Sequence, residues 1–388
     1  MDLRFGYSHD KRIRTVAFAM ISATVLASCA AGSTSQAPAS GIVPPPPPAS
    51  TLPAASASPV ASPTPDASGQ ASQSAFQWVR SDPEKANGPA AESVFAWSGG
   101  YVVTYHLGPT VFASRDGQAW GNAVALKPAG GDPFNFLAEG PEGLLGVSSI
   151  VGCEMGGSTC KVSPPLLWMS ANGSAWDQIQ DVSALGSDPL IAAAGGGKGY
   201  LIAGLKTLFY SADGRSWRST TGIGNLVRFT SAIADSHGFE VAGLVSASGG
   251  YSAAVWTSSD GANWTRTVLG AIPTNSEAQI HRVGLTLVVC DVAPLATGPG
   301  TAWTSVDGQT WTKTDEEHQV FWSDGSRAMA ISDDGVFVST NGLSWTKVST
   351  SGDSNLSPKG SSVDIAAMGP SGLVVVYIGS VWLLLPPK

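Results

Sequence analysis

A seven-residue pattern, S-x-[DN]-G-x-x-W, occurs six times in this chain and constrains its fold more than any other feature. Recurrence of this kind is typical of architectures built from repeated supersecondary units. The glycine permits a positive φ in a tight connection, and the Asp or Asn before it can accept hydrogen bonds from nearby backbone amides. The tryptophan begins the next strand and brings a large surface to bury. The defining residues are Ser114, Asp116, Gly117, Trp120, Ser170, Asn172, Gly173, Trp176, Ser211, Asp213, Gly214, Trp217, Ser258, Asp260, Gly261, Trp264, Ser305, Asp307, Gly308, Trp311, Ser339, Asn341, Gly342 and Trp345.

Short apolar stretches separated by glycine-rich turns precede each copy of this heptapeptide. In residues 189–220 the stretches LIAAA, YLIAG, TLFYS and SWRST predict four β-strands, and the heptapeptide is the turn between the third and fourth. No segment beyond residue 75 shows a convincing 3.6-residue period over 12 residues. We therefore expect each unit to be a four-stranded antiparallel sheet whose last turn is the heptapeptide.

The heptapeptide resembles the Asp-box, or BNR, repeat, although the usual spelling S-x-D-x-G-x-x-W has one more residue before the glycine. The resemblance covers roughly residues 76–388. It implies a β-propeller, in which four-stranded blades surround a central channel and leave only short sheet edges. The boxes of such propellers lie at the periphery, away from the usual ligand site, so the resemblance implies a structural role for all six copies.

The number of blades follows from the units that the chain can complete. The segment 362–385 shows three more strands and no heptapeptide, while FQWVR at 76–80 looks like the strand that follows one. We predict that Phe76–Arg80 completes the last blade of a single all-β, seven-bladed propeller; six blades is the alternative. The six complete units are expected at 94–125, 134–180, 190–220, 227–268, 279–314 and 319–349.

The N-terminus has the order of features found in a bacterial export signal. A basic head precedes an apolar run of 13 residues at 15–27, which is shorter than the roughly 20 residues of a membrane-spanning helix. The LASC sequence at 26–29 resembles the lipobox of bacterial lipoproteins. The resemblance implies that 1–28 is a signal peptide and that Cys29 carries the lipid; an ordinary signal peptide with an incidental cysteine is the alternative.

Residues 29–75 are predicted to link the lipidated cysteine to the propeller domain at 76–388. This segment is rich in Ala, Ser and Pro and has almost no large apolar side chain, so it cannot bury enough surface to fold. Two or more acyl chains would hold the protein firmly on a lipid bilayer. We expect a membrane-anchored lipoprotein on the extracytoplasmic side of the cell envelope.

Charge and cysteine content narrow the partners and the compartment. The chain carries a formal charge of −8, which becomes −10 once the four bases and two acids of residues 1–29 are removed. An acidic surface argues against nucleic acid as a partner. Cys153 and Cys160 flank a glycine-rich loop and are expected to form a local disulfide, with two free thiols as the alternative. Cys290 lies in an apolar run and is predicted to be a buried free thiol.

The face of the propeller without heptapeptides is the predicted working surface. Long connections between the second and third strands are expected there in blades 2, 4 and 5, and long loops on a rigid scaffold commonly bind ligands. Arg228, His281 and Arg282 are predicted near the starts of innermost strands on this face. Two guanidinium groups at one channel mouth could bind a carboxylate or phosphate; the alternative is surface charges beside acidic crossovers.

No catalytic motif accompanies the repeat. Sialidases, the best-known Asp-box enzymes, carry an Arg-Ile-Pro motif that is missing here, and the six arginines outside the signal and heptapeptides do not form their triad. Other Asp-box relatives, such as photosystem assembly factors and sortilin-type receptors, are non-catalytic. We expect a monomeric binding or scaffold protein for a protein, peptide or glycan, without cofactor or metal. A divergent, sialidase-like glycoside hydrolase is the alternative.

Overall fold

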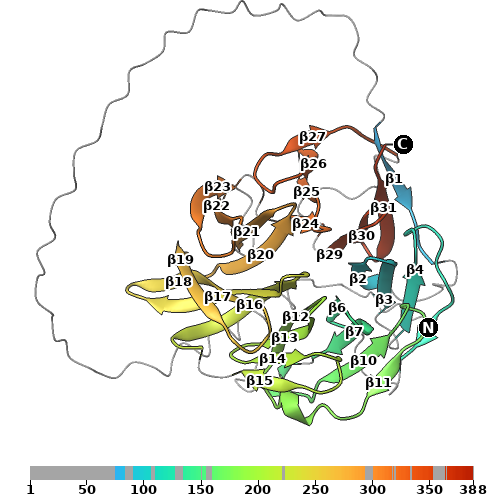
Figure 1. Ribbon diagram of the computed structural model, residues 1–388. Helices are drawn as coiled ribbons and strands as arrows, with labels where there is room; N and C mark the ends of the chain where they lie inside the picture. The colour runs from blue at the N-terminus through green and yellow to red at the C-terminus, as the bar shows by residue number, and fades with distance from the viewer. Residues whose placement is uncertain are drawn as a thin grey trace, which may run out of the picture. The chain divides into compact units, whose positions relative to one another are not determined.

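Seven four-stranded antiparallel blades make up the part of the chain that the structure describes (Figure 1). The predicted signal peptide, Cys29 and linker lie outside that part, and the described residues belong to one unit, Ser74–Lys388. The structure, a computed structural model, describes residues 75–83, 91–105, 110–126, 134–149, 151–153, 160–220, 223–292, 300–316, 318, 320–332, 334–352, 363 and 365–387.

The four strands of each blade are named a to d from the channel outward. The a strands are β2 (Ala91–Trp97), β6 (Phe136–Gly140), β12 (Leu190–Gly196), β16 (Leu226–Ala234), β20 (Glu277–Val283), β24 (Trp322–Ser323) and β29 (Ile365–Gly369). The b strands are β3 (Gly100–Tyr105), β7 (Gly143–Ser148), β13 (Gly199–Gly204), β17 (Phe239–Ala247), β21 (Thr286–Val292), β25 (Ala328–Ser332) and β30 (Gly372–Tyr377). The c strands are β4 (Thr110–Ser114), β10 (Leu166–Ser170), β14 (Leu208–Ser211), β18 (Gly250–Ser258), β22 (Gly300–Ser305), β26 (Gly335–Ser339) and β31 (Ser380–Leu385). The d strands are β5 (Val124–Ala125), β11 (Asp177–Ile179), β15 (Arg218–Thr220), β19 (Thr265–Ile272), β23 (Thr312–Glu316), β27 (Thr346–Val348) and β1 (Phe76–Arg80).

The innermost strands form a closed ring. Each a strand contacts the a strand of the next blade, in the order β2, β6, β12, β16, β20, β24, β29 and back to β2. The predicted seven-bladed propeller is therefore confirmed, and the six-bladed alternative is wrong. Among the described residues the helical structure is one short 3-10 helix, η2 (Ser183–Leu185), and no helix is long and apolar enough to cross a membrane.

The hydrophobic core lies between successive blades. Tyr200 and Ile202 of β13 pack on Leu145 of β7 and Leu167 of β10, which joins blades 2 and 3. The b strands β3 and β13 are buried along their whole length because a neighbouring blade covers each face of the sheet. A strand covered on both faces needs a largely apolar sequence, as in GYVVTY of β3 and GYLIAG of β13.

The heptapeptides and the a–b turns lie on the same face. A Cβ added to Gly199, which begins β13 with φ 119°, would lie 2.4 Å from the carbonyl oxygen of Ser211, which begins the heptapeptide of blade 3. Gly100 and Gly238 contact Ser114 and Ser258 in the same way in blades 1 and 4. We call this the heptapeptide face. The opposite side, which holds the b–c connections and the crossovers between blades, is the loop face.

The two ends of the propeller domain meet in blade 7. Strand β1 pairs antiparallel with β31 over four residue pairs, from Gln77 opposite Leu385 to Arg80 opposite Trp382. This confirms that Phe76–Arg80 completes the last blade. A further short strand, β28 (Thr350–Ser351), pairs in parallel with the outer edge of β1, so this sheet has five strands. The added strand was not predicted.

Two b–c connections on the loop face contain β-ribbons. In blade 2 the b–c connection contains a small hairpin of β8 (Val151–Cys153) and β9 (Cys160–Val162). In blade 4 the predicted long b–c loop is wrong, because β17 and β18 continue through it to a turn at residues 248–249. Blade 3 between them has the short connection at 205–207 that the sequence indicated. Most of the predicted b–c loop of blade 5, at 293–299, lies outside the described residues.

Candidate functional site

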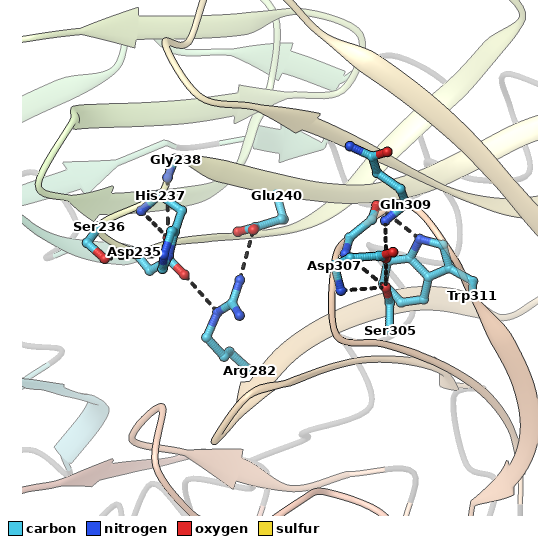
Figure 2. Close-up of polar contacts among 11 residues, drawn as sticks. Asp235, Ser236, His237, Gly238, Glu240, Arg282, Ser305, Asp307, Gln309 and Trp311 are labelled. Carbon is cyan, nitrogen blue, oxygen red and sulfur yellow. Dashed lines mark hydrogen bonds and ion pairs between the residues drawn. The ribbon is translucent and has the colours of Figure 1, made fainter.

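The heptapeptides use their polar atoms within their own turns. In five of the six copies the serine Oγ accepts a hydrogen bond of 2.9 Å from the backbone N–H of the glycine. In blade 5, drawn in Figure 2, Asp307 Oδ1 accepts bonds from the amides of Gln309 and Thr310 at 2.8 and 2.7 Å. Ser305 donates its hydroxyl hydrogen to the same carboxylate at 2.9 Å. These contacts support a structural role for the heptapeptides.

The electrostatics of these turns agree with that role. Backbone amides of Ser216 and Arg215 lower the pKa of Asp213 to about 2, because they bind only the ionised carboxylate well. The glycines all adopt the left-handed conformation that the turn requires, with φ between 69° and 74°. The tryptophan of blade 5, Trp311, donates its Nε1–H to the carbonyl oxygen of Gly308 at 3.2 Å. Little in these turns is left to bind a ligand.

Arg228 lies near the start of β16, toward the loop face, as predicted. Its Nη2 is 3.3 Å from Oε1 of Glu277, at the start of β20 in the next blade. Burial raises the pKa of Glu277, and the nearby guanidinium opposes this shift. Arg228 is thus already paired with a carboxylate at the place where an anionic ligand was expected.

His281 and Arg282 are at the other end of their strand. β20 starts at Glu277, two residues earlier than the expected unit, so both residues precede the a–b turn on the heptapeptide face. Arg282 is five residues from Glu277, which corresponds to about 16 Å along a strand. The structure therefore does not bring Arg228 and Arg282 to one channel mouth. The expected pair of guanidinium groups for a single anionic ligand is absent from the described residues.

His281 packs against the following blade. Its ring centroid is 4.3 Å from that of Phe321, and its Nε2 is buried without a hydrogen-bond partner. Burial lowers the pKa of this imidazole to about 4, so the ring is neutral at ordinary pH. His281 is therefore a half-buried residue that packs at the interface between blades 5 and 6.

Arg282 instead joins two carboxylates of blade 4, as Figure 2 shows. Its Nε is 2.9 Å from Oδ2 of Asp235, in the a–b turn, and its Nη2 is 2.9 Å from Oε1 of Glu240, the second residue of β17. Asp235 Oδ1 also accepts backbone hydrogen bonds from His237 at 2.6 Å and Gly238 at 3.2 Å. We call Asp235, Glu240 and Arg282 the interblade triad.

Glu240 is the most perturbed member of the triad. The residue is 8% exposed, and its Oε2 is buried without a hydrogen-bond partner. Burial raises the pKa of Glu240 to about 7; the positive charge of Arg282 opposes the shift and the negative charge of Asp235 adds to it. Asp235 is the opposite case, because backbone amides and Arg282 lower the pKa of its carboxyl despite partial burial.

The structure describes the backbone of Cys153 and Cys160 and the whole of Cys290. Cys153 and Cys160 are directly opposite each other in the antiparallel pairing of β8 with β9, although their side chains are outside the described set. The disulfide stays a prediction, and adjacent backbone positions are what it requires. Cys290 is buried, as expected. Within the described ranges no three His, Cys, Asp or Glu side chains are grouped so that they could hold a metal ion.

Comparison with known proteins shows the fold and nothing finer. No family model and no curated protein matches the sequence. The WD40 domain of Neurospora crassa Pan2 matches with a TM-score of 0.52 and 11% identity, over 81% of this chain and 95% of that one. Streptogramin B lyase matches with a TM-score of 0.50 and 8% identity, over 80% of this chain and 97% of that one.

A third structure belongs to a longer protein. The extracellular domain of the putative one component system BT4673 from B. thetaiotaomicron matches with a TM-score of 0.50 and 11% identity, over 81% of this chain and 40% of that one. Such low identities establish a shared β-propeller fold and carry no function from one protein to another.

Proposed function

We propose that this chain is a membrane-tethered, non-catalytic binding or scaffold propeller of the bacterial cell envelope. Its heptapeptides are Asp-box repeats that hold the blades, and its loop face recognises a protein, peptide or glycan. The tether is residues 29–75, attached through the lipidated Cys29. The propeller fold is consistent with a binding or scaffold role, and the remaining parts of the proposal rest on the sequence and on the two faces of the ring.

The difference between the two faces carries the proposal. On the heptapeptide face Asp307 bonds within its own turn, and Arg282 pairs with two carboxylates of the neighbouring blade. On the loop face two ribbons, β8–β9 and the ends of β17 and β18, form the b–c connections of the blades that flank blade 3 and its short connection. The tip of the blade 4 ribbon, residues 246–249, is exposed. Exposed connections on a rigid scaffold are where partners usually bind.

A pair of matched substitutions tests the face. The full chain is expressed in its native envelope and cross-linked, and partners are compared for Ser248→Arg on the loop face and Val306→Arg on the heptapeptide face, where Val306 is 77% exposed. We expect Ser248→Arg to abolish capture of a specific envelope component and Val306→Arg to retain it. The wild-type chain should be in the membrane fraction and Cys29→Ala in the soluble one. Loss of capture with Val306→Arg alone would contradict the assignment of the face.

The alternative enzyme has one observation in its favour. A buried glutamate with a pKa near 7 beside an arginine and a second carboxylate is a pattern of acid catalysis in glycosidases. Against it, Glu240 Oε2 is buried, and Glu240 and Asp235 both bind Arg282 instead of flanking an open cleft. Turnover of a fluorogenic sialoside that disappears in Glu240→Gln would establish the enzyme and overturn the non-catalytic proposal.

A further inference from the structure

Glu240 occupies a position that the other six blades fill with an apolar side chain. In blades 1 to 6 one residue of the b strand pairs with the heptapeptide serine, and the residue after it faces the next blade. In blade 4 Phe239 pairs with Ser258, and Glu240 is the residue that faces the next blade. Blade 7 lacks a heptapeptide, and there the corresponding b-strand residue follows Leu373, which pairs with Leu384. The corresponding residues of the other blades are Val102, Leu145, Leu201, Val288, Met329 and Val374, all buried in interblade core clusters.

A carboxylate at this position is costly unless its interactions offset the loss of water. Arg282 offsets part of the cost with one contact of 2.9 Å to Oε1, but Oε2 has no partner. Asp235 binds the same guanidinium through Nε, so the two carboxylates share one positive charge. The single positive charge of Arg282 can therefore balance one ionised carboxylate of the triad. Ionising the second carboxylate costs free energy, because that charge is buried without a balancing partner.

We propose that the interblade triad is a proton-dependent clasp between blades 4 and 5, which closes when Glu240 takes up a proton and loosens when Glu240 ionises. With Glu240 neutral, Arg282 and Asp235 form a balanced ion pair across the interface. With Glu240 ionised, the buried Oε2 draws in water, and the easiest route for it is opening of the a–b turn at residues 235–238. The inference does not depend on the proposed binding function.

The groups that act on Glu240 are few. Arg282 comes from β20, Asp235 and His237 come from the a–b turn, and β18 presents the uncharged Thr257 opposite Glu240. His237 is exposed to water, with its side chain 86% accessible, so its influence is screened. Arg282 and Asp235, whose side chains are 23% and 21% exposed, are the principal partners.

The sign of the pH effect follows from the raised pKa. The folded chain binds the proton of Glu240 up to about pH 7, whereas the unfolded chain releases it near the usual value of 4.5. This contribution to stability is complete below about pH 4.5 and is lost as the pH rises to about 7. The size of this loss depends on the pKa of Glu240 in the unfolded and the folded chain. Ionisation of Glu240 should therefore raise the unfolding equilibrium constant about 30-fold between pH 5.5 and 8.5.

Urea unfolding of the full chain at pH 5.5, 7 and 8.5 tests the clasp. We expect the ratio of the unfolding constants of wild type and Glu240→Gln to rise about 30-fold over this range, because glutamine keeps the shape and cannot ionise. Glu240→Leu, which restores the residue type of blades 2 and 3, should remove the same pH dependence. Glu139→Gln is the matched control: Glu139 is the next-to-last residue of the a strand β6 on the same face, and its carboxylate accepts the backbone N–H of Ser98 at 2.8 Å. This control should keep the wild-type pH dependence.

Carbon-13 NMR of the glutamate side-chain carboxyls supplies a second measurement that does not require unfolding. A resonance titrating near pH 7 should be missing in Glu240→Gln. Asp235→Asn should lower its midpoint by removing a negative charge, and Arg282→Gln should raise it by removing a positive one. A Glu240→Gln variant with wild-type pH dependence, or a Glu240 resonance that titrates near 4.5, would overturn the clasp.

Discussion

At the scale of single residues, the glycine of each heptapeptide combines two requirements. Its φ lies in the left-handed region, and in blade 3 the space beside Gly214 is filled by Met169 of the preceding blade, whose Sδ would be 2.8 Å from an added Cβ. Both the backbone conformation and the packing of the preceding blade therefore exclude a Cβ at this position. This explains why the glycine is invariant among the six copies while the residue before it is Asp in four and Asn in two.

Comparing two glycines separates these requirements. The heptapeptide glycine of blade 5, Gly308, has φ 71°, and the nearest atoms to an added Cβ lie at an ordinary contact distance of 3.6 Å, so Gly308→Ala should cost only the left-handed strain, about 1 kcal/mol. Gly214→Ala adds the clash with Met169 and should cost about 1–3 kcal/mol more. Urea unfolding at pH 7 measures both. Equal losses would show that the neighbouring blade yields freely to the added methyl group.

The position of Glu240 could have been found from the sequence, but its partners could not. Alignment of the b strands after their a–b turns sets GFEVAG beside GYVVTY and GYLIAG, and the glutamate is then the only charge at its position. Its pairing with Arg282 depends on where β20 begins, and the sequence placed that start two residues late. Side chains alternate between the two faces of a strand, so starting β20 two residues earlier leaves Arg282 on the same face of the strand. The earlier start moves Arg282 toward the C-terminal end of β20, which is why it lies on the heptapeptide face.

At the scale of secondary-structure elements, the sequence predicted the blades better than the connections. Glycine turns, apolar runs and the heptapeptide mark strand ends by local chemistry, so all seven blades were found. The small, polar sequence SASGGYSA predicts a loop for the b–c connection of blade 4, whereas this segment forms a ribbon whose register is set by β17 and β18. The parallel strand β28 depends on a distant partner, β1, and has no local pattern.

The hairpin of blade 2 gives a prediction at this scale. Because Cys153 and Cys160 are directly opposite in β8 and β9, we expect a disulfide when the chain is in an oxidising compartment. Alkylation of the unfolded, unreduced chain should then modify Cys290 and leave Cys153 and Cys160 unmodified until a reductant is added. Modification of all three thiols without reductant would show that the hairpin holds free cysteines.

At the scale of the whole molecule, one short strand closes the ring. Strand β1 supplies Trp78, which is buried in the cluster shared by blades 6 and 7. Ser81, just beyond it, accepts a hydrogen bond from Trp120 of blade 1 at 3.0 Å, and Asp82 accepts one from the backbone of Val381 at 2.7 Å. Blades 6, 7 and 1 thus all contact the segment around Trp78.

Removing the side chain of Trp78 should therefore weaken the closed ring as a unit. Trp78→Ala is expected to lower the free energy of unfolding by about 3–5 kcal/mol, as for other large-to-small changes in a core. Gln77→Ala is the control, because Gln77 is exposed on the same strand. Urea unfolding and hydrogen exchange of β31 measure the effect. A loss confined to residues 76–80, with β31 still protected, would mean that blade 7 holds together without its outer strand.

The strand that closes the ring is also the first part of the domain to receive a pull on the N-terminus. Phe76 begins β1, which is bonded along one edge to β31 and along the other to β28. Tension along this strand loads both rows of backbone hydrogen bonds lengthwise, so they must break together and not one at a time. An anchor attached through residues 29–75 would therefore transmit its load to β1, and detachment under force would open the circle at blade 7 first.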